Sequence, residues 1–278
     1  MPPTDLVFDD GEPLESNRHR IATNVLIRSM RQGWGDRDDY FVGGNMFVYY
    51  SRQQARNRDF RGPDFFAVLD VDGTRDRQGW VVWEENGRYP DIIIELMSPL
   101  TAEVDTGVKR EIYERTFRTP NYYVYDPFDP NSLQGWYCDA TQRYRALTPN
   151  DRGWLWCERL GWWVGIWNGT IETVDAPWLR FYDRQGNLIP LPEEAARQQA
   201  QQERQRAEAA ERRAETADIR AARRQLLRLL SLRFETVPEV IETCLQPLTL
   251  EQLERLIEIA IAAESIENFR QQLDDISS

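Results

Sequence analysis

One short stretch of the sequence holds three side chains that could do acid–base or phosphate chemistry. The segment DTGVKREIY places Lys109 four residues after Asp105 and four residues before Tyr113. Lys109 is the only lysine of the chain, and the other residues among the 34 lysines and arginines are all arginine. A lysine ammonium is compact and shifts its pKa when buried, whereas a guanidinium is wide, flat and always charged. Lys109 is therefore a candidate catalytic residue, with Asp105 and Tyr113 as accessory candidates.

Two carboxylates come before Lys109 in segments that are typical of strands. Glu95 interrupts the apolar run of PDIIIELMSP, and Asp64 opens GPDFFAVLD. An isolated carboxylate in apolar surroundings costs several kcal/mol, or stays protonated, unless a cation compensates it. Carboxylates from neighbouring strands can share Mg²⁺ or Mn²⁺, which turns a bound water into a nucleophile. The ammonium of Lys109 could then orient that water or offset charge that builds on a phosphate.

The same residues also allow a purely structural interpretation. Lys109 and Asp105 could form an ion pair on an exposed helix face, which contributes only a few tenths of a kcal/mol. The single lysine could also reflect a genome that favours arginine codons. Spacing alone supports the catalytic and the structural interpretations equally.

Other candidate residues have stronger structural alternatives. His19 is the only histidine, so a histidine-rich zinc site is excluded. It could assist a site one helical turn after Glu15, although such a histidine is more often a polar residue at a helix end. Seven of the ten tryptophans fall in residues 134–182 and could stack unpaired bases, but strand aromatics are more often core. Asp126, before a proline, is typical of a turn.

Hydrophobic periodicity predicts the elements that must position these residues. A helix is expected over about 15–32, with its apolar residues at helical spacing: Ile21, Val25, Leu26 and Met30. A meander of strands is expected next, over 45–51, 64–73, 80–86 and 91–98.

A second helix is expected over residues 101–117, with Val104, Val108 and Ile112 as its buried stripe. The apolar segment 121–127 follows as a strand. Strand, helix and strand in this order predict a right-handed crossover between parallel strands. The expected fold class is therefore α/β, with a mixed sheet and flanking helices.

The remainder of the chain divides by composition. Further strands and hairpins are expected over 134–182, so that a first domain covers 1–190. Residues 191–230 are rich in Ala, Arg and Glu and predict a long helix, either a coiled coil through its alanine seam or a solvated spacer. Residues 231–278 predict a small helical domain. There, Thr249 and Gln252 have capping-box spacing ahead of apolar residues at helical spacing: Leu253, Leu256, Ile257 and Ile261.

Composition limits the possible classes of protein. The 278 residues include 41% hydrophobic residues, which is typical of a globular chain. The net charge of −12 argues against a broad basic face for nucleic acid. No apolar run is long enough to span a bilayer. The acidic N-terminus lacks the features of a signal peptide, and three widely spaced cysteines fit a reducing compartment, so a cytoplasmic location is expected.

Several ordered motifs resemble a known family. GPD at 62–64, PDIIIELMSP, DTGVKREIYE, PNYYVYDP and WLRFYDRQGNLIP together resemble the Uma-two family. This is a family of restriction-endonuclease-like proteins in the PD-(D/E)XK superfamily, abundant in cyanobacteria. The similarity runs from about residue 5 to 192.

The resemblance implies a restriction-endonuclease-like fold and Mg²⁺- or Mn²⁺-dependent hydrolysis of DNA phosphodiester bonds. It implies Asp64 and Glu95 as metal ligands and Lys109 as the catalytic lysine, and Glu15 matches an acidic residue that the superfamily often carries on its first helix. Asp91 also precedes the Glu95 strand, but the superfamily's two acids lie on different strands, which favours Asp64. Met97 stands where the superfamily has a lysine, so that role is expected to have moved to Lys109.

Two further readings stay open. A catalytically inactive nuclease fold could serve as an interaction scaffold, and a hydrolase of a smaller phosphate ester has the same residue requirements. The segment after 230 resembles a small helical domain of unknown function that is often appended to nuclease-like proteins. A homodimer is expected, either through the core or through this tail.

Overall fold

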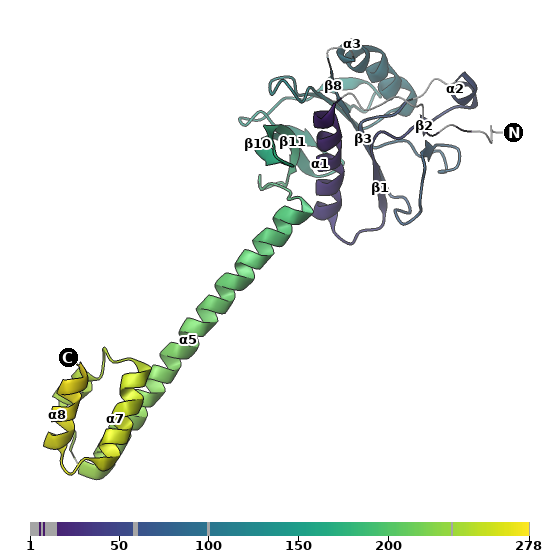
Figure 1. The fold of residues 1–278 in the computed structure, drawn as a ribbon. Coiled ribbons are helices and arrows are strands. Elements are labelled where there is room, and N and C mark those ends of the chain that lie inside the picture. The colour runs from purple at the N-terminus through teal and green to yellow at the C-terminus, as the bar shows by residue number, and fades with distance from the viewer. Residues whose placement is uncertain are drawn as a thin grey trace. The chain divides into compact units, whose positions relative to one another are not determined.

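The computed structural model describes residues 6, 8, 16–57, 61–98, 101–234 and 236–277. The chain divides into two units, Met1–Ala195 and Ala196–Ser278. The first unit contains the strands and the candidate site, and the second is helical. Figure 1 shows the elements of each unit in chain order.

Within the described residues, a six-stranded mixed sheet forms the centre of the first unit. Its strand order is β1-β3-β5-β6-β7-β8. The neighbours β5 and β6 run parallel, whereas the other neighbouring pairs are antiparallel. The predicted mixed α/β class is confirmed. The strands are β1 (Tyr40–Gly43), β3 (Phe65–Leu69), β5 (Ile92–Leu96), β6 (Asn121–Tyr125), β7 (Gln134–Cys138) and β8 (Tyr144–Ala146).

A helical segment connects β5 to β6, as the predicted crossover requires. It consists of α3 (Ala102–Val104), η1 (Asp105–Lys109), α4 (Arg110–Ile112) and η2 (Tyr113–Phe117). Both η1 and η2 are π-helical turns, which are wider than α-helical turns and are frequent at functional sites. This segment covers the face of the sheet that carries Phe66, Ile93 and Tyr122.

The opposite face of the sheet is covered by α1 (Asn17–Trp34) and by a second sheet of order β11-β10-β9. Figure 1 shows α1 beside β10 and β11. The predicted helix and the burial of its four apolar residues are confirmed. Its N-terminus is capped by Ser16, whose side chain accepts a hydrogen bond from the backbone N–H of His19. The second sheet comprises β9 (Leu155–Cys157), β10 (Trp162–Ile171) and β11 (Val174–Tyr182).

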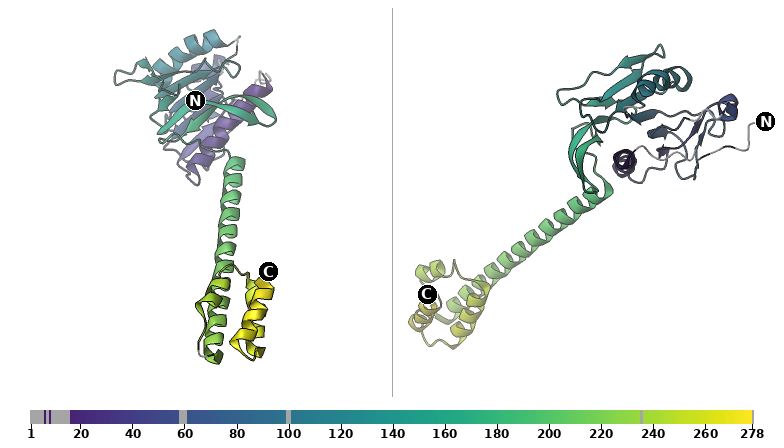
Figure 2. Two further views of the ribbon diagram at one scale, coloured as in Figure 1. Left: turned by 90° about the vertical axis from the view of Figure 1, so that its left-hand side faces the viewer. Right: turned by 45° about the horizontal axis from the view of Figure 1, so that its top comes forward.

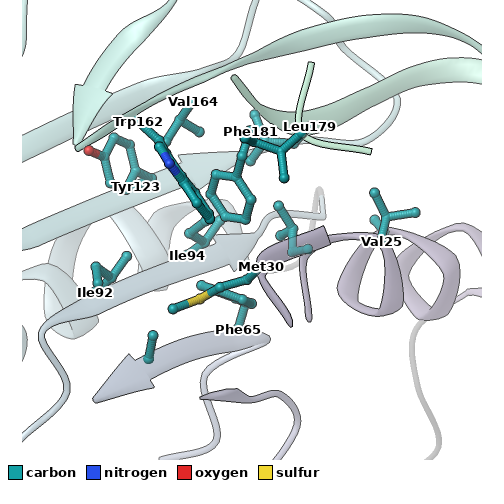
Figure 3. Packing of buried hydrophobic residues seen from close by; sticks show 14 of the residues in the cluster. Val25, Met30, Phe65, Ile92, Ile94, Tyr123, Trp162, Val164, Leu179 and Phe181 are labelled. Atoms are coloured by element: carbon teal, nitrogen blue, oxygen red, sulfur yellow. The ribbon is translucent and has the colours of Figure 1, made fainter. Parts of the chain in front are cut away.

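The core between these layers is built from apolar side chains of distant segments. Figure 3 shows Met30 of α1, Phe65 and Ile94 of the main sheet, and Trp162 and Phe181 of the second sheet in one cluster. Three tryptophans of the 134–182 segment are buried, which favours the core interpretation for them: Trp136, Trp162 and Trp178.

The predicted meander is wrong in two places. The strands expected over 45–51 and 80–86 shorten to β2 (Val48–Tyr49) and β4 (Trp80–Val81), which pair with each other in parallel as a separate sheet. Their place beside β3 is taken by β1, which was not predicted. Strand pairing depends on contacts between distant residues, and short apolar runs do not reveal their partners. A short helix, α2 (Arg52–Asn57), follows β2.

The second unit is formed around the long helix α5 (Pro192–Phe234), which begins in the first unit. It also contains α6 (Glu239–Cys244), α7 (Leu250–Ala262) and α8 (Ile266–Ser277). Figure 2 shows α5 as one continuous helix, with α7 and α8 beside its C-terminal part. The long predicted helix is confirmed, whereas a coiled coil through its alanine seam stays a prediction.

The capping box at the start of α7 is confirmed, because Thr249 and Gln252 exchange the expected hydrogen bonds. Leu253 and Leu256 are buried, whereas Ile261 is 63% exposed. The buried stripe continues through Ala260 instead, which lies seven residues after Leu253. Among the described residues, no helix combines the length and the apolarity needed to cross a bilayer.

Candidate active site

Asp64 and Glu95 lie opposite each other on adjacent strands. The antiparallel register pairs Phe65 with Ile94, so the next residues on each side face one another. Oδ2 of Asp64 accepts a hydrogen bond from the backbone N–H of Leu96 at 2.8 Å. The backbone N–H of Asp64 donates to Oε2 of Glu95 at 3.5 Å. The pairing of β3 with β5 therefore brings together two acids that are 31 residues apart.

Glu95 is fully buried and both of its carboxylate oxygens have partners. The hydroxyl of Tyr113 donates to Oε1 at 2.7 Å. The Nζ atom of Lys109 lies 3.1 Å from Oε2. A buried carboxylate needs such partners, because the low dielectric around it makes an uncompensated charge costly.

Lys109 also contacts Asp105, one turn earlier on the same helical segment. Nζ lies 2.8 Å from Oδ1 of Asp105, whose side chain is only 1% exposed. The backbone carbonyl of Asp105 accepts a hydrogen bond from the hydroxyl of Tyr122 at 2.7 Å. The ion pair of the structural interpretation thus exists, but its carboxylate is buried and its ammonium also contacts Glu95.

The buried stripe predicted for this helix is wrong. Val104 and Val108 are 46% and 57% exposed, and Ile112 is only partly buried. The segment instead turns Asp105 and Tyr113 inward, one residue further along the helix. Residues four apart share a helix face, so both stripes satisfy the same spacing. The buried carboxylate of Glu95 decides between them, because it requires the ammonium and hydroxyl groups of the polar stripe.

Burial and neighbouring charges shift the pKa values of the site. Burial raises the pKa of the Asp64 carboxyl well above its usual value, and the charge of Glu95 raises it further. Burial also raises the pKa of Glu95, although the ammonium of Lys109 opposes this. Burial alone would lower the pKa of Lys109, but the charges of Glu95 and Asp105 outweigh it and raise that pKa. Lys109 is thus held as a positive charge.

Three carboxylates face one ammonium here, so a divalent cation suits the charge of the site. Asp64 and Glu95 would supply carboxylate oxygens, the ligand type that Mg²⁺ and Mn²⁺ accept together with water. Among the described residues, no three side chains of the types His, Cys, Asp and Glu are grouped so that they could hold a metal ion. The described part of the chain therefore offers two carboxylate ligands. Glu15, the third predicted ligand, lies outside the described residues.

The other candidates named from the sequence make contacts that support the fold. His19 is 4% exposed and its Nε2 lies 3.3 Å from the carbonyl oxygen of Met97, so it links α1 to the end of β5. Asp126 accepts a hydrogen bond from the backbone N–H of Phe128 and is a turn residue, as expected. Asp91 lies at the other end of β5, where it contacts the backbone N–H of Leu69 and the side chain of Arg159.

A cavity of about 740 Å³ runs along β1 and the 73–77 turn. It reaches Gly44, where a Cβ would collide with the carbonyl oxygen of Asp64. Two of its arginines are neutralised: Arg37 pairs with Asp39 at 2.8 Å, and Arg77 pairs with Glu85 at 2.8 Å. The cavity is therefore close to Asp64, and neighbouring acids neutralise part of the charge of its arginines.

Two groups that position the site could not be identified from the sequence. The backbone N–H of Leu96 holds Asp64, and the hydroxyl of Tyr122 holds the helix at Asp105. An apolar residue whose backbone orients a carboxylate is not distinguishable from any other strand residue. The tyrosine is one of several in NYYVYDP, and only the tertiary fold selects it.

The match to a family model agrees with the sequence motifs. Residues 4–167 match the model of the Uma2 family, described as "Putative restriction endonuclease". A solved structure described as "a putative nuclease belonging to DUF820" from Anabaena variabilis is 13% identical, with a TM-score of 0.37, over 58% of this chain and 86% of that chain. No curated protein matches. Since the family model covers more than half of the 278 residues, the chain belongs to the Uma2 family of restriction-endonuclease-related proteins.

Proposed function

We propose that this protein is a metal-dependent endonuclease that hydrolyses DNA phosphodiester bonds. The observation that carries the proposal is the convergence of Asp64, Glu95 and Lys109, which come from three separate elements. The ammonium lies 3.1 Å from Glu95, and Glu95 in turn contacts Asp64. Membership of the Uma2 family, described as "Putative restriction endonuclease", supports DNA as the substrate class.

Each residue has a distinct role in this proposal. Asp64 and Glu95, assisted by Glu15, would hold Mg²⁺ or Mn²⁺, which supplies an activated water and polarises the phosphate. Lys109 would stabilise the negative charge that develops on the phosphate, since its raised pKa keeps it protonated. Asp105 and Tyr113 are positioning residues, because they hold the ammonium and the carboxylate in place.

The test is cleavage of single-stranded, nicked and branched DNA by the full chain with Mg²⁺ or Mn²⁺. Glu95→Gln keeps the size of the side chain and removes its charge, so it should abolish cleavage. Glu111→Gln is the matched control, because Glu111 is 58% exposed on the same helical segment and pairs only with Arg115 among the described ion pairs. Cleavage that survives Glu95→Gln would contradict the assignment.

A second candidate is a catalytically inactive nuclease fold that acts as an interaction scaffold. It is favoured by the net charge of −12 and by the neutralised arginines of the cavity beside β1. This candidate predicts no heat of Mg²⁺ or Mn²⁺ binding in calorimetry, and loss of self-association when the helical tail is disrupted. The proposed endonuclease predicts measurable metal binding that Asp64→Asn removes.

A further inference from the structure

Phe128 is an exposed aromatic side chain on the loop that follows β6. Its side chain is 58% exposed, more than those of the other exposed aromatics in the described part of the chain, Phe8 at 36% and Tyr137 at 42%. Single exposed apolar side chains are common on protein surfaces. The exposure of Phe128 therefore gains meaning only from the contacts that hold its ring in one position at the end of the sheet where Glu95 lies.

The ring of Phe128 is held from several sides. The guanidinium carbon of Arg18 lies 4.6 Å from the ring centroid, a cation–π contact. The Nη1 atom of Arg18 also donates to the carbonyl oxygen of Pro127 at 3.2 Å. The backbone N–H of Phe128 donates to Oδ1 of Asp126 at 2.8 Å, and the loop is closed by a hydrogen bond from the backbone N–H of Asp126 to Oγ of Ser132 at 2.8 Å. The ring is therefore preorganised.

This loop starts at the end of the sheet where the candidate acids lie. Glu95 is paired with Val124 on the neighbouring strand, and strands in a sheet lie about 4.8 Å apart. The backbone N–H of Met97, two residues after Glu95, donates to the carbonyl oxygen of Tyr125 at 2.8 Å. The strand that enters the loop is thus fixed next to the strand that carries Glu95.

A second connection runs through α1. The ring of His19 lies 6.1 Å from that of Phe128, and Nε2 of His19 lies 3.3 Å from the carbonyl oxygen of Met97. The exposed ring and the strand that carries Glu95 therefore share one rigid support. A group bound on Phe128 would lie at the same end of the sheet as Glu95, on the side that α1 covers.

We propose that Phe128 and Arg18 form a stacking platform for an unpaired nucleobase at the end of the sheet that carries the candidate active site. Arg18 covers part of one side of the ring, and the exposed part can stack on a base, while the cation favours the adjacent backbone phosphate. Bases in a duplex are already stacked on their neighbours, so the platform selects DNA with an unpaired nucleotide. This inference rests on the proposed nuclease function, because it names the substrate class of the same site.

The test uses the full chain in Ca²⁺ buffer and oligonucleotides that carry 2-aminopurine, either single-stranded or fully paired. Stacking on Phe128 should quench the fluorescence of the single-stranded probe. Phe128→Leu should remove the quenching and weaken binding of that probe about tenfold, the effect of losing one stacked base. Phe128→Trp should retain both, and binding of the duplex should not change.

Tyr137→Leu is the matched control. Tyr137 is also exposed, but it pairs with Asn121 at the start of β6, away from the candidate acids, so this variant should behave as wild type. Absence of quenching with wild type at saturating protein, or equal losses for the single strand and the duplex in Phe128→Leu, would overturn the platform. Quenching that depends on Phe128 without any cleavage would leave the platform intact and refute the nuclease. Cleavage that requires Glu95 but not Phe128 would refute the platform alone.

Discussion

The ammonium of Lys109 lies 3.1 Å from Oε2 of Glu95, although the two residues belong to different elements. The same ammonium lies 2.8 Å from Oδ1 of Asp105, so a single positive charge is shared by two buried carboxylates. A compact ammonium fits between two such groups, whereas a planar guanidinium directs its donors in a fixed fork. This geometry gives a physical reason for one lysine in a chain that otherwise uses arginine.

Lys109→Arg should lower metal-dependent cleavage of DNA by at least about 100-fold, the loss typical of removing one group that stabilises developing charge. The positive charge is retained, so the effect would come from its misplacement relative to Glu95 and Asp105. Single-turnover cleavage rates measure it, and far-UV circular dichroism checks that the fold persists. Arg115→Lys is the control, because Arg115 is 61% exposed and should tolerate the exchange. Wild-type rates in Lys109→Arg would exclude Lys109 from the chemistry.

Tyr113→Phe should lower the free energy of unfolding by about 1–3 kcal/mol, because it leaves a buried carboxylate oxygen without its hydrogen bond. Urea denaturation of the single variants and of the double variant with Glu95→Gln would give the coupling energy between the two side chains. Tyr182→Phe is a suitable comparison, since its hydroxyl donates to a backbone carbonyl, that of Ile166 at 3.1 Å, and not to a carboxylate. A coupling energy of zero between Tyr113 and Glu95 would show that the bond does not matter for stability.

Asp64→Asn should raise the melting temperature in metal-free buffer by about 2–4 °C. The folded protein raises the pKa of Asp64, so this carboxyl binds protons more tightly in the folded than in the unfolded state. The contribution of this carboxyl to the free energy of unfolding is most favourable below the pKa that Asp64 has in the unfolded chain. It is lost as pH rises through the pKa that Asp64 has in the folded protein. The gain from Asp64→Asn should therefore be larger at pH 8 than at pH 5.

Mg²⁺ provides the complementary measurement. Mg²⁺ should raise the melting temperature of the wild type at pH 8 but not that of Asp64→Asn. In the wild type, the bound cation would offset the negative charge of the buried Asp64 carboxylate, and this charge is absent from the variant. Equal responses of the two proteins to Mg²⁺ would mean that Asp64 holds no metal.

The start of α5 allows a comparison of a buried and an exposed ion pair. Arg180 is fully buried and pairs with Glu194 at 2.6 Å, whereas Arg28 is 42% exposed and pairs with Glu193 at 2.5 Å. Arg180→Leu should lower the free energy of unfolding by about 3–5 kcal/mol, because it removes the positive charge that compensates the partly buried carboxylate of Glu194. Arg28→Leu should lower the free energy of unfolding by only about 0–1 kcal/mol, because its ion pair is exposed to water.

Tryptophan fluorescence during urea denaturation would measure both ion-pair variants. All ten tryptophans lie before residue 195, so the signal reports on the first unit alone. Equal losses of stability in Arg180→Leu and Arg28→Leu would contradict the role of burial.

Local patterns determined much of the fold. The apolar spacing in α1 predicted its four buried residues, and the order of strand, helix and strand predicted the parallel pair of β5 and β6. The long helix and the capping box at Thr249 were also readable, because helix signals lie within a few residues of one another. The strand β1 and the pairing of β2 with β4 were not, since their partners lie far away in the sequence.

For the candidate site, the sequence by itself determined the residue types: an acid within an apolar strand, a second acid at a strand start, and one lysine on the helix that follows. The tertiary structure alone decided that Asp64 faces Glu95 and that the polar stripe of the crossover helix, not Val104 and Val108, is turned inward. Both stripes have the same period, and local spacing cannot distinguish them. The choice depends on the electrostatic cost of burying Glu95, which exists only after the strands have paired.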